Sequence, residues 1–185
     1  MATVSSGTSL SANYFLRKFY ESNRDAIKGS TRNNYSSSEL SYEDARALHR
    51  AAKALDNYGY DENDNKENVN ATIKALVSTY NNALDSTKKG DSPEVERYTR
   101  RLKNLMKQYS DEFEDIGVTF KADGKLSCND NLLKSSKIDT VKEIFGKDSG
   151  FTRQLKQISK GLNTASLNDI YTALTGKGQQ INITL

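Results

Sequence analysis

Hydrophobic residues recur along most of this chain at steps of three or four, the spacing that places them on one face of an α-helix. This spacing predicts a first helix over residues 11–28 and a second helix that begins at Ser41. The second helix carries a narrow apolar seam made of Ala45, Leu48, Ala52 and Leu55. Between the two helices, residues 29–40 are rich in serine and asparagine and predict a loop or linker. The small polar residues 1–9 predict a disordered N-terminal end.

Two further helices follow, and the fourth has the clearest start signal in the chain. The third helix ends at the basic stretch 88–90. Its apolar face consists of Val69, Ile73, Leu76, Val77, Tyr80 and Leu84. The fourth begins with Ser92 as its cap, and Pro93 takes the first helical position, where no N–H is needed. Its stripe consists of Val95, Tyr98, Leu102, Leu105, Tyr109 and Phe113. We therefore expect the third and fourth helices to pair as an antiparallel hairpin.

The hydrophobic period changes from helical to alternating at residues 117–128, which predicts two short strands. Asp123 and Gly124 form the turn, because glycine tolerates the positive φ that tight hairpins require. The residues expected to face inward are Val118, Phe120, Leu126 and Cys128. An isolated two-stranded hairpin is marginally stable in water. We therefore expect it to lie against the helices and to close one end of the helical pair.

Short helices are predicted after the hairpin. Asn129 or Asp130 caps the first of them, and Asp139 caps the second, which Gly146 ends. The apolar residues of these two helices are Leu132, Leu133, Val141, Ile144 and Phe145. The chain therefore returns to helix directly after the strands.

Two amphipathic helices are predicted in the last part of the chain. The first carries Phe151, Leu155, Ile158 and Leu162 on one face. Ser166 caps the second, shorter helix, and Gly176 ends it. Residues 181–185 alternate in polarity, which suggests a further strand beside the hairpin.

The composition favours a thin, elongated architecture. Only 35% of the 185 residues are hydrophobic and the mean hydropathy is −0.76, so little apolar material is available for a thick core. A chain of this length is expected to form one domain, here residues 10–185. The expected fold class is mainly α: an antiparallel, coiled-coil-like helical bundle with one small β-hairpin near residues 117–128.

The charge balance and the absence of membrane signals narrow the class of protein. The net charge is +3, from 27 basic and 24 acidic residues, which argues against a dedicated polyanion binder. No stretch approaches the ~20 apolar residues that a transmembrane helix needs. The N-terminus lacks the pattern of a secretory signal peptide. We therefore expect a cytoplasmic protein, or an extracellular one that is exported without a cleaved signal.

An ordered set of short motifs runs through residues 116–162, after the long fourth helix. The matching positions are Gly117 with Val118, Asp123 to Leu126, Leu132 with Leu133, Val141 with Ile144 and Phe145, and Gly150 with Phe151 and Leu155. This order resembles the C-terminal module of the bacterial flagellar filament-cap protein, the hook-associated capping protein. The resemblance implies a non-catalytic structural or protein-interaction module, with flagellar-type export as a route out of the cell.

The resemblance is partial, covering a quarter to a third of the chain. The family's long C-terminal coiled-coil helix is replaced by the predicted short helix around Ser166, and its large outer domains are missing. Filament capping itself is therefore not implied.

The lone histidine and the lone cysteine favour structural roles. His49 has no second histidine or cysteine partner for a zinc site, so it is interpreted as a partly exposed structural residue. Cys128 lies on the inward face of a strand, which predicts a buried, unreactive thiol. We expect Cys128 to react with a thiol reagent only after denaturation.

The sequence carries no pattern of an enzyme, a metal site or a cofactor site. Residues 61–68 place oxygen ligands at alternate positions as a calcium loop does, but Lys66 stands where the turn glycine is required. The bidentate glutamate expected near Thr72 is also absent, so a solvated loop that caps the next helix is expected. No phosphate-binding loop, nucleophile elbow or recognisable acid pair appears. We expect no enzyme activity and no small-molecule substrate.

Two groups of basic residues are candidates for binding. The first lies on the fourth helix and consists of Arg97, Arg100, Arg101, Lys103 and Lys107. The second consists of Arg153, Lys156 and Lys160. Acidic neighbours dilute the first group, and a solvated helix face is the default interpretation of both. The second stripe also fits an acidic partner or a neighbouring copy of the chain.

Three functions follow from these patterns. The first is a structural or protein-interaction module related to the flagellar filament cap, with a protein partner or self-association. The second is a stand-alone helical adaptor unconnected with flagella. The third, which the charge balance disfavours, is a weak nucleic-acid binder that uses the basic helix faces and therefore binds in a strongly salt-dependent way.

Overall fold

The computed structural model describes residues 32–60, 66–88, 90 and 92–175, and the chain divides at Ser36 into two compact units. In the first unit the described residues include a short 3-10 helix, η1 (Arg32–Asn34). The second unit holds all the other described elements. The predictions for residues 1–9, for the helix over 11–28 and for the strand over 181–185 lie outside the described residues.

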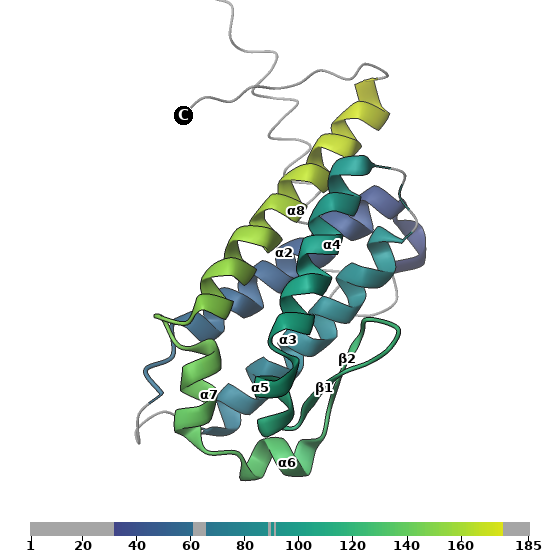
Figure 1. The fold of residues 1–185 in the computed structure, drawn as a ribbon. Coiled ribbons are helices and arrows are strands. Elements are labelled where there is room, and N and C mark those ends of the chain that lie inside the picture. The colour runs from purple at the N-terminus through teal and green to yellow at the C-terminus, as the bar shows by residue number, and fades with distance from the viewer. Residues whose placement is uncertain (1–31, 61–65, 89, 91, 176–185) are drawn as a thin grey trace, which may run out of the picture. The chain divides into compact units, whose positions relative to one another are not determined.

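Four long helices and a small hairpin make up the second unit, which is mainly α as expected (Figure 1). The long helices are α2 (Ser37–Asp56), α3 (Lys66–Thr87), α4 (Pro93–Gln108) and α8 (Gly150–Thr175). The strands are β1 (Val118–Phe120) and β2 (Leu126–Cys128), which pair antiparallel. The short helices are α5 (Ser110–Asp115), α6 (Asp130–Ser135) and α7 (Ile138–Phe145).

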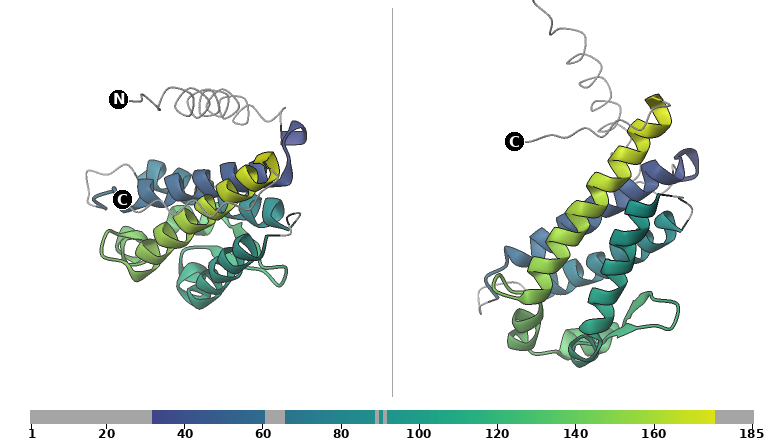
Figure 2. Two further views of the ribbon diagram at one scale, coloured as in Figure 1. Left: turned by 90° about the horizontal axis from the view of Figure 1, so that it is seen from above. Right: turned by 45° about the horizontal axis from the view of Figure 1, so that its top comes forward.

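The pairing of the helices differs from the expected one. α2 packs along both α3 and α8, and α4 packs chiefly on α8. The views of Figure 2 agree in placing α2 and α8 side by side. The expectation that the third and fourth helices form the main pair is wrong, since α3 and α4 contact each other only lightly. The reason is that the apolar face of α3 is shared between α2 and the hairpin.

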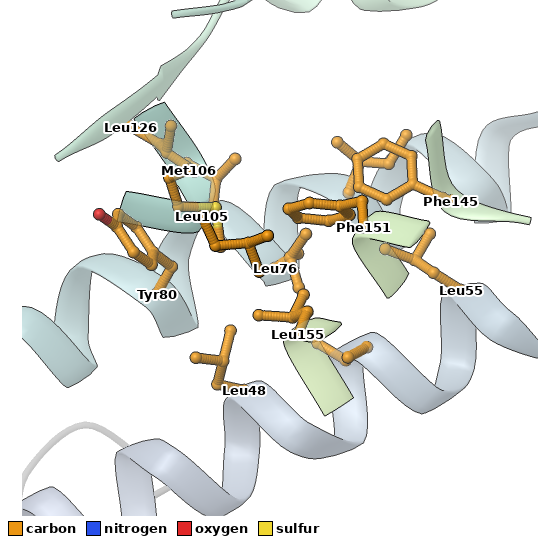
Figure 3. Packing of buried hydrophobic residues seen from close by; sticks show 14 of the residues in the cluster. Leu48, Leu55, Leu76, Tyr80, Leu105, Met106, Leu126, Phe145, Phe151 and Leu155 are labelled. Carbon is orange, nitrogen blue, oxygen red and sulfur yellow. The ribbon is translucent and has the colours of Figure 1, made fainter. Parts of the chain in front are cut away.

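The core is one continuous cluster of apolar side chains contributed by every long helix. Figure 3 shows Leu48 of α2, Leu76 of α3 and Leu155 of α8 pointing toward one another. The predicted seam of α2 is fully buried, and Ala45 and Ala52 are at most 1% exposed. Small residues at these positions let the neighbouring backbones approach closely.

α2 begins earlier than the sequence pattern indicated. It starts at Ser37, so the expected linker is shorter than residues 29–40, and Ser41 lies inside the helix. Ser41 is only 3% exposed because it continues the buried face of α2 toward its N-terminus. A serine in a helical run is a cap only where the backbone before it is extended, and here the helix already precedes it.

The fourth helix starts as predicted and ends sooner. Ser92 has extended backbone and its hydroxyl accepts a hydrogen bond from the backbone N–H of Val95. The expected stripe continues to Phe113, but the helix breaks at Tyr109, where φ is −104° and ψ is 20°. The hydroxyl of Ser110 donates to the carbonyl of Lys107 at 2.9 Å, across this break.

The two helices expected after residue 150 are one helix, α8. Ser166 does not cap a new helix; it is fully buried within α8. Other hydroxyls along α8 donate to carbonyls one turn back, as Ser159 does to Leu155 at 2.7 Å, so they fit inside a helix. Residues 163–175 therefore continue α8 and do not form a separate helix.

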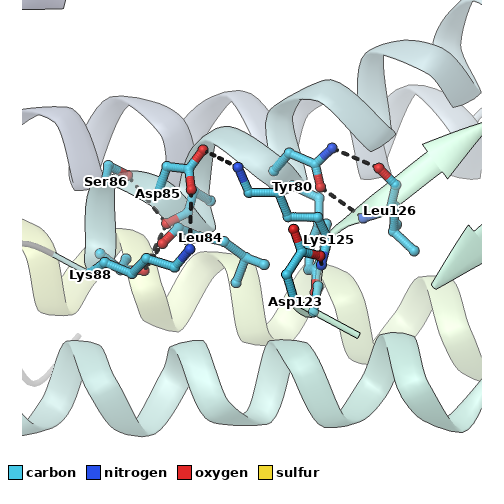
Figure 4. Close-up of polar contacts among 12 residues, drawn as sticks. Tyr80, Leu84, Asp85, Ser86, Lys88, Asp123, Lys125 and Leu126 are labelled. Carbon is cyan, nitrogen blue, oxygen red and sulfur yellow. Dashed lines mark hydrogen bonds and ion pairs between the residues drawn. The ribbon is translucent and has the colours of Figure 1, made fainter. Parts of the chain in front are cut away.

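The hairpin confirms the predicted strands and turn, but it lies along α3 and does not close an end. Its register pairs Val118 with Cys128 and Phe120 with Leu126. Gly124 in the turn has a φ of 84°. Val118 and Leu126 are buried, while the other two inward residues are half-buried and pack on the core. Figure 4 shows the polar contacts that attach the hairpin to α3.

Side chains of α3 hold the backbone of β2 and of the turn. The amide of Asn81 donates to the carbonyl of Leu126 at 2.8 Å and accepts from the N–H of the same residue at 2.9 Å. The hydroxyl of Tyr80 donates to the carbonyl of Gly124 at 2.6 Å. Lys125 pairs with Asp85 at 2.7 Å. These contacts explain why the hairpin lies on the flank of α3.

The structure shows which residues cap α6 and α7. Asn129, not Asp130, caps α6, because its side chain accepts from two backbone N–H groups of the first turn. The expected cap at Asp139 is wrong: Lys137 is the cap residue of α7, with no side-chain hydrogen bond, and Asp139 lies in the first turn. There its carboxylate still favours the positive end of the helix dipole. Gly146 ends α7 as predicted.

Gly161 of α8 faces the ring of Tyr98 on α4, and this contact gives a test of the α4–α8 packing. A β-carbon at position 161 would lie 2.3 Å from Cε1 of Tyr98. We expect Gly161→Ala to lower the free energy of unfolding by about 1–3 kcal/mol through overpacking. In a Tyr98→Ala background the same change is expected to raise stability by about 1 kcal/mol, because alanine is the better helix former. Urea denaturation of the four proteins checks this; a loss of equal size in both backgrounds would contradict the packing.

Candidate interaction surface

His49 marks the line along which α2 and α8 meet at the surface. Its Nδ1 lies 3.2 Å from the carbonyl oxygen of Lys156 and 3.1 Å from the hydroxyl of Ser159. The side-chain amide of Asn163, one turn after Ser159 on α8, donates to the carbonyl of Tyr42 on α2 at 3.0 Å. His49 is therefore a half-buried structural residue, which agrees with its interpretation from the sequence.

Lys53, Lys156 and Lys160 lie close enough to His49 to affect its pKa. Three further cations lie within two turns of these on the same two helices, and we call the six the α2/α8 basic face. It consists of Arg46, Arg50, Lys53, Arg153, Lys156 and Lys160. Burial is the main reason that the pKa of His49 is lowered, and the charges of Lys53, Lys160 and Lys156 lower it further. His49 therefore stays neutral at pH 7 while charged groups surround it. The sequence predicted only the α8 half of this face, because the pairing of α2 with α8 was not foreseen.

Most of the cations on this face form no ion pair within the part of the chain that the structure describes. Lys156 pairs with Asp56 at 2.6 Å, and Arg46 lies 4.0 Å from Glu43. The side chains of four other members form no ion pair with another described residue and are exposed to solvent: Arg50, Lys53, Arg153 and Lys160. Two of the six cations thus lie beside a carboxylate of a described residue, and one of these two carboxylates carries less than a full charge at neutral pH.

That carboxylate is Glu43. Burial of its side chain raises its pKa to about 7, although the nearby charges of Arg46 and Arg50 act in the opposite direction. One of its oxygens is buried and makes no hydrogen bond within the part of the chain that the structure describes. Glu43 is therefore partly protonated at pH 7, and the basic face gains positive charge as the pH falls.

The elevated pKa of Glu43 has a consequence for stability. The folded state holds a proton on Glu43 that the unfolded state has lost, so stability from this group falls as the pH rises from 4.5 to about 7. We expect Glu43→Gln to be more stable than the parent protein by on the order of 1 kcal/mol at pH 8. At pH 4 the two should be equally stable. Urea denaturation at both pH values checks this, and a constant difference between the two proteins would contradict it.

Two of the five cations of the first basic group, on α4, form ion pairs within their own helix. Arg97 pairs with Glu94 at 3.1 Å, and Arg100 pairs with Glu96 at 3.5 Å. The guanidinium groups of Arg97 and Arg101 lie 5.1 Å and 5.6 Å from the centre of the Tyr98 ring. α4 therefore offers less free positive charge than the α2/α8 basic face.

Acidic side chains gather at α5, which contacts α4, α7 and β1. Phe113 is buried and anchors the helix, while its four carboxylates are exposed: Asp111, Glu112, Glu114 and Asp115. None of the four forms an ion pair with another residue in the described ranges. We call these four residues the α5 acidic cluster.

Cys128 packs against the core as predicted, but it is half-buried and not fully buried. Burial is the main cause that raises the pKa of its thiol, and the charge of Asp130 adds to the effect. A raised pKa lowers the thiolate fraction and hence the reactivity. Slow labelling of the native protein and rapid labelling after denaturation are the expected results; rapid labelling of both would contradict this placement.

The remaining predictions about sites concern absences. Residues 61–65 of the expected solvated loop lie outside the described residues, and α3 begins at Lys66. Among residues that the structure describes, no three histidine, cysteine or acidic side chains gather as metal ligands. None of the described helices is both long and apolar enough to cross a membrane.

Comparisons with protein-family models, with curated proteins and with solved structures found no match to this chain.

Proposed function

We propose that this chain is a non-catalytic structural or protein-interaction module that binds an acidic surface through its α2/α8 basic face. The observation that carries the proposal is the gathering of six cations from two helices about a hundred positions apart. Four of these cations are exposed and form no ion pair with another described residue. Charges arranged in this way steer an oppositely charged partner and set its orientation.

We further propose that the module is related to the C-terminal part of the flagellar filament-cap protein. The positions that carry the resemblance are those that build the hairpin and its surroundings. Gly117 has a φ of 79° next to α6, and Asp123 with Gly124 forms the turn. Leu133, Val141, Ile144, Phe145, Phe151 and Leu155 are buried. α8 begins inside this block, at Gly150, and continues without a break to Thr175.

An affinity experiment with flagellar components tests both parts of the proposal. The full chain is immobilised and incubated with purified flagellar filament and hook-associated proteins of the source organism. Capture by the parent protein and loss of capture by Lys53→Glu/Lys160→Glu is the expected result. Arg100→Glu/Lys107→Glu on α4 changes the charge by the same amount outside the face and should leave capture unchanged.

Other outcomes separate the alternatives. Capture of a non-flagellar protein that depends on Lys53 and Lys160 would favour the stand-alone helical adaptor and remove the flagellar relation. Steeply salt-dependent binding of single-stranded DNA, with no protein captured, would favour the nucleic-acid binder. Capture that is unaffected by reversal of Lys53 and Lys160 would overturn the role of the basic face.

A further inference from the structure

The α2/α8 basic face and the α5 acidic cluster lie on different elements of the same unit. α2 packs on α3 and α8, whereas α5 packs on α4, α7 and β1. Neither set neutralises the other within one molecule, because no ion pair joins them among the described residues. Within the described part of the chain, each surface therefore keeps charge that a second molecule can meet.

The four carboxylates of α5 project from one side of a single helical segment. Asp111 and Asp115 are one turn apart, and Glu112 and Glu114 flank them, while Phe113 points into the core and is 1% exposed. Residues three and four apart in a helix share a face. The cluster is therefore a compact acidic projection that the ring of Phe113 holds in place.

The basic face carries charge opposite to that of the acidic cluster along two adjacent helices. Its cations occupy two stripes, one on each of two adjacent helices. Arg46, Arg50 and Lys53 recur at steps of four and three along α2, and the stripe on α8 recurs at steps of three and four. Each stripe spans about 10 Å at a rise of ~1.5 Å per residue. The line between them is occupied by the neutral His49.

We propose that a second copy of this chain places its α5 acidic cluster on the α2/α8 basic face. This inference rests on the proposed function and names its partner as the chain itself. The contact joins different surfaces of the two molecules, so it leaves one basic face and one acidic cluster free at the two ends of each pair. Contacts of that kind lead to rings or open chains of molecules.

The charged character of the contact makes the association dependent on salt. Exposed ion pairs are individually weak and act mainly on the rate and orientation of encounter. The association is therefore expected at high protein concentration and about 0.01 M salt, where the screening length is ~30 Å, and is lost near 1 M salt, where it is ~3 Å.

Charge reversal with cross-rescue tests the proposal. Lys53→Glu/Lys160→Glu reverses the basic face, and Asp111→Lys/Glu114→Lys reverses the acidic cluster. In sedimentation velocity at low salt, each variant alone should self-associate at least about tenfold more weakly than the parent protein. An equimolar mixture of the two variants should regain association, since every surface then meets its opposite.

Controls and opposing outcomes are defined by the same measurement. Arg100→Glu/Lys107→Glu should associate as the parent protein does, and circular dichroism verifies that each variant is folded. A protein that remains monomeric at all concentrations overturns the inference, as does an Asp111→Lys/Glu114→Lys variant that associates normally. Binding of a single-stranded DNA probe to the basic face without self-association also overturns it. A monomer that still captures a flagellar protein through Lys53 and Lys160 overturns this inference and leaves the proposed function standing.

Discussion

Replacing Phe151 with alanine is expected to lower the free energy of unfolding by about 3–5 kcal/mol. Phe151 is fully buried at the start of α8, and its ring centre lies 5.1 Å from those of Tyr109 and Phe113 and 5.6 Å from that of Phe145. These edge-to-face contacts join α8 to the short helices and to the end of α4. The substitution leaves a cavity that the surrounding rings cannot fill without leaving their own contacts.

Urea denaturation followed by circular dichroism measures this effect, and Phe120→Ala is the matched control. Phe120 is half-buried on the hairpin and packs only against the edge of the core. Phe120→Ala should lower the free energy of unfolding by less than half as much as Phe151→Ala does. Equal costs at the two positions would mean that the four-ring cluster does not connect α8 to the rest of the molecule.

Replacing Gly117 with alanine is expected to destabilise the protein by about 2–5 kcal/mol, the sum of backbone strain and overpacking. The φ of Gly117 is 79°, and a β-carbon there would lie 2.5 Å from the β-carbon of Leu132 and 3.1 Å from the backbone nitrogen of Leu133. The carbonyl of Gly117 also accepts from the N–H of Asn129 at 2.8 Å, so the chain cannot easily move away.

Gly124→Ala separates the two causes. Gly124 also has a positive φ, of 84°, but the nearest atom to an added β-carbon is Cε of Lys103 at 3.6 Å. Only backbone strain opposes Gly124→Ala, so its free energy of unfolding is expected to be about 1–2 kcal/mol lower, as measured by urea denaturation. A Gly117→Ala protein that is no less stable than Gly124→Ala would show that α6 does not approach the strand as closely as described.

Some features that depend on a few neighbouring residues were predictable from the sequence, although the caps expected at Ser41 and Asp139 were wrong. Ser92 with Pro93, and Asp123 with Gly124, act through their own backbone and the next two or three residues, so their chemistry fixes a helix start or a turn locally. The buried face of α3 was predictable for a related reason, because a helical period shows which side of a helix is apolar.

Features that depend on distant partners were not predictable. The break at Tyr109 positions rings that meet α8, and the continuity of α8 through Ser166 depends on a buried environment that no nearby residue signals. The pairing of α2 with α8 could not be read from an apolar seam, since a seam shows that a partner exists without identifying it. The basic face was missed for that reason: half of it lies on α2 and half on α8.

The place of α2 in the structure has a consequence for how the protein is made. α2 comes early in the chain, yet one side of it is covered by α8, which follows about a hundred residues later. During synthesis on the ribosome this apolar side of α2 has no native neighbour until α8 has emerged. Contacts between such distant segments form slowly, and the apolar surface stays exposed in the meantime. A nascent chain stalled before residue 150 would therefore be a natural client for a chaperone.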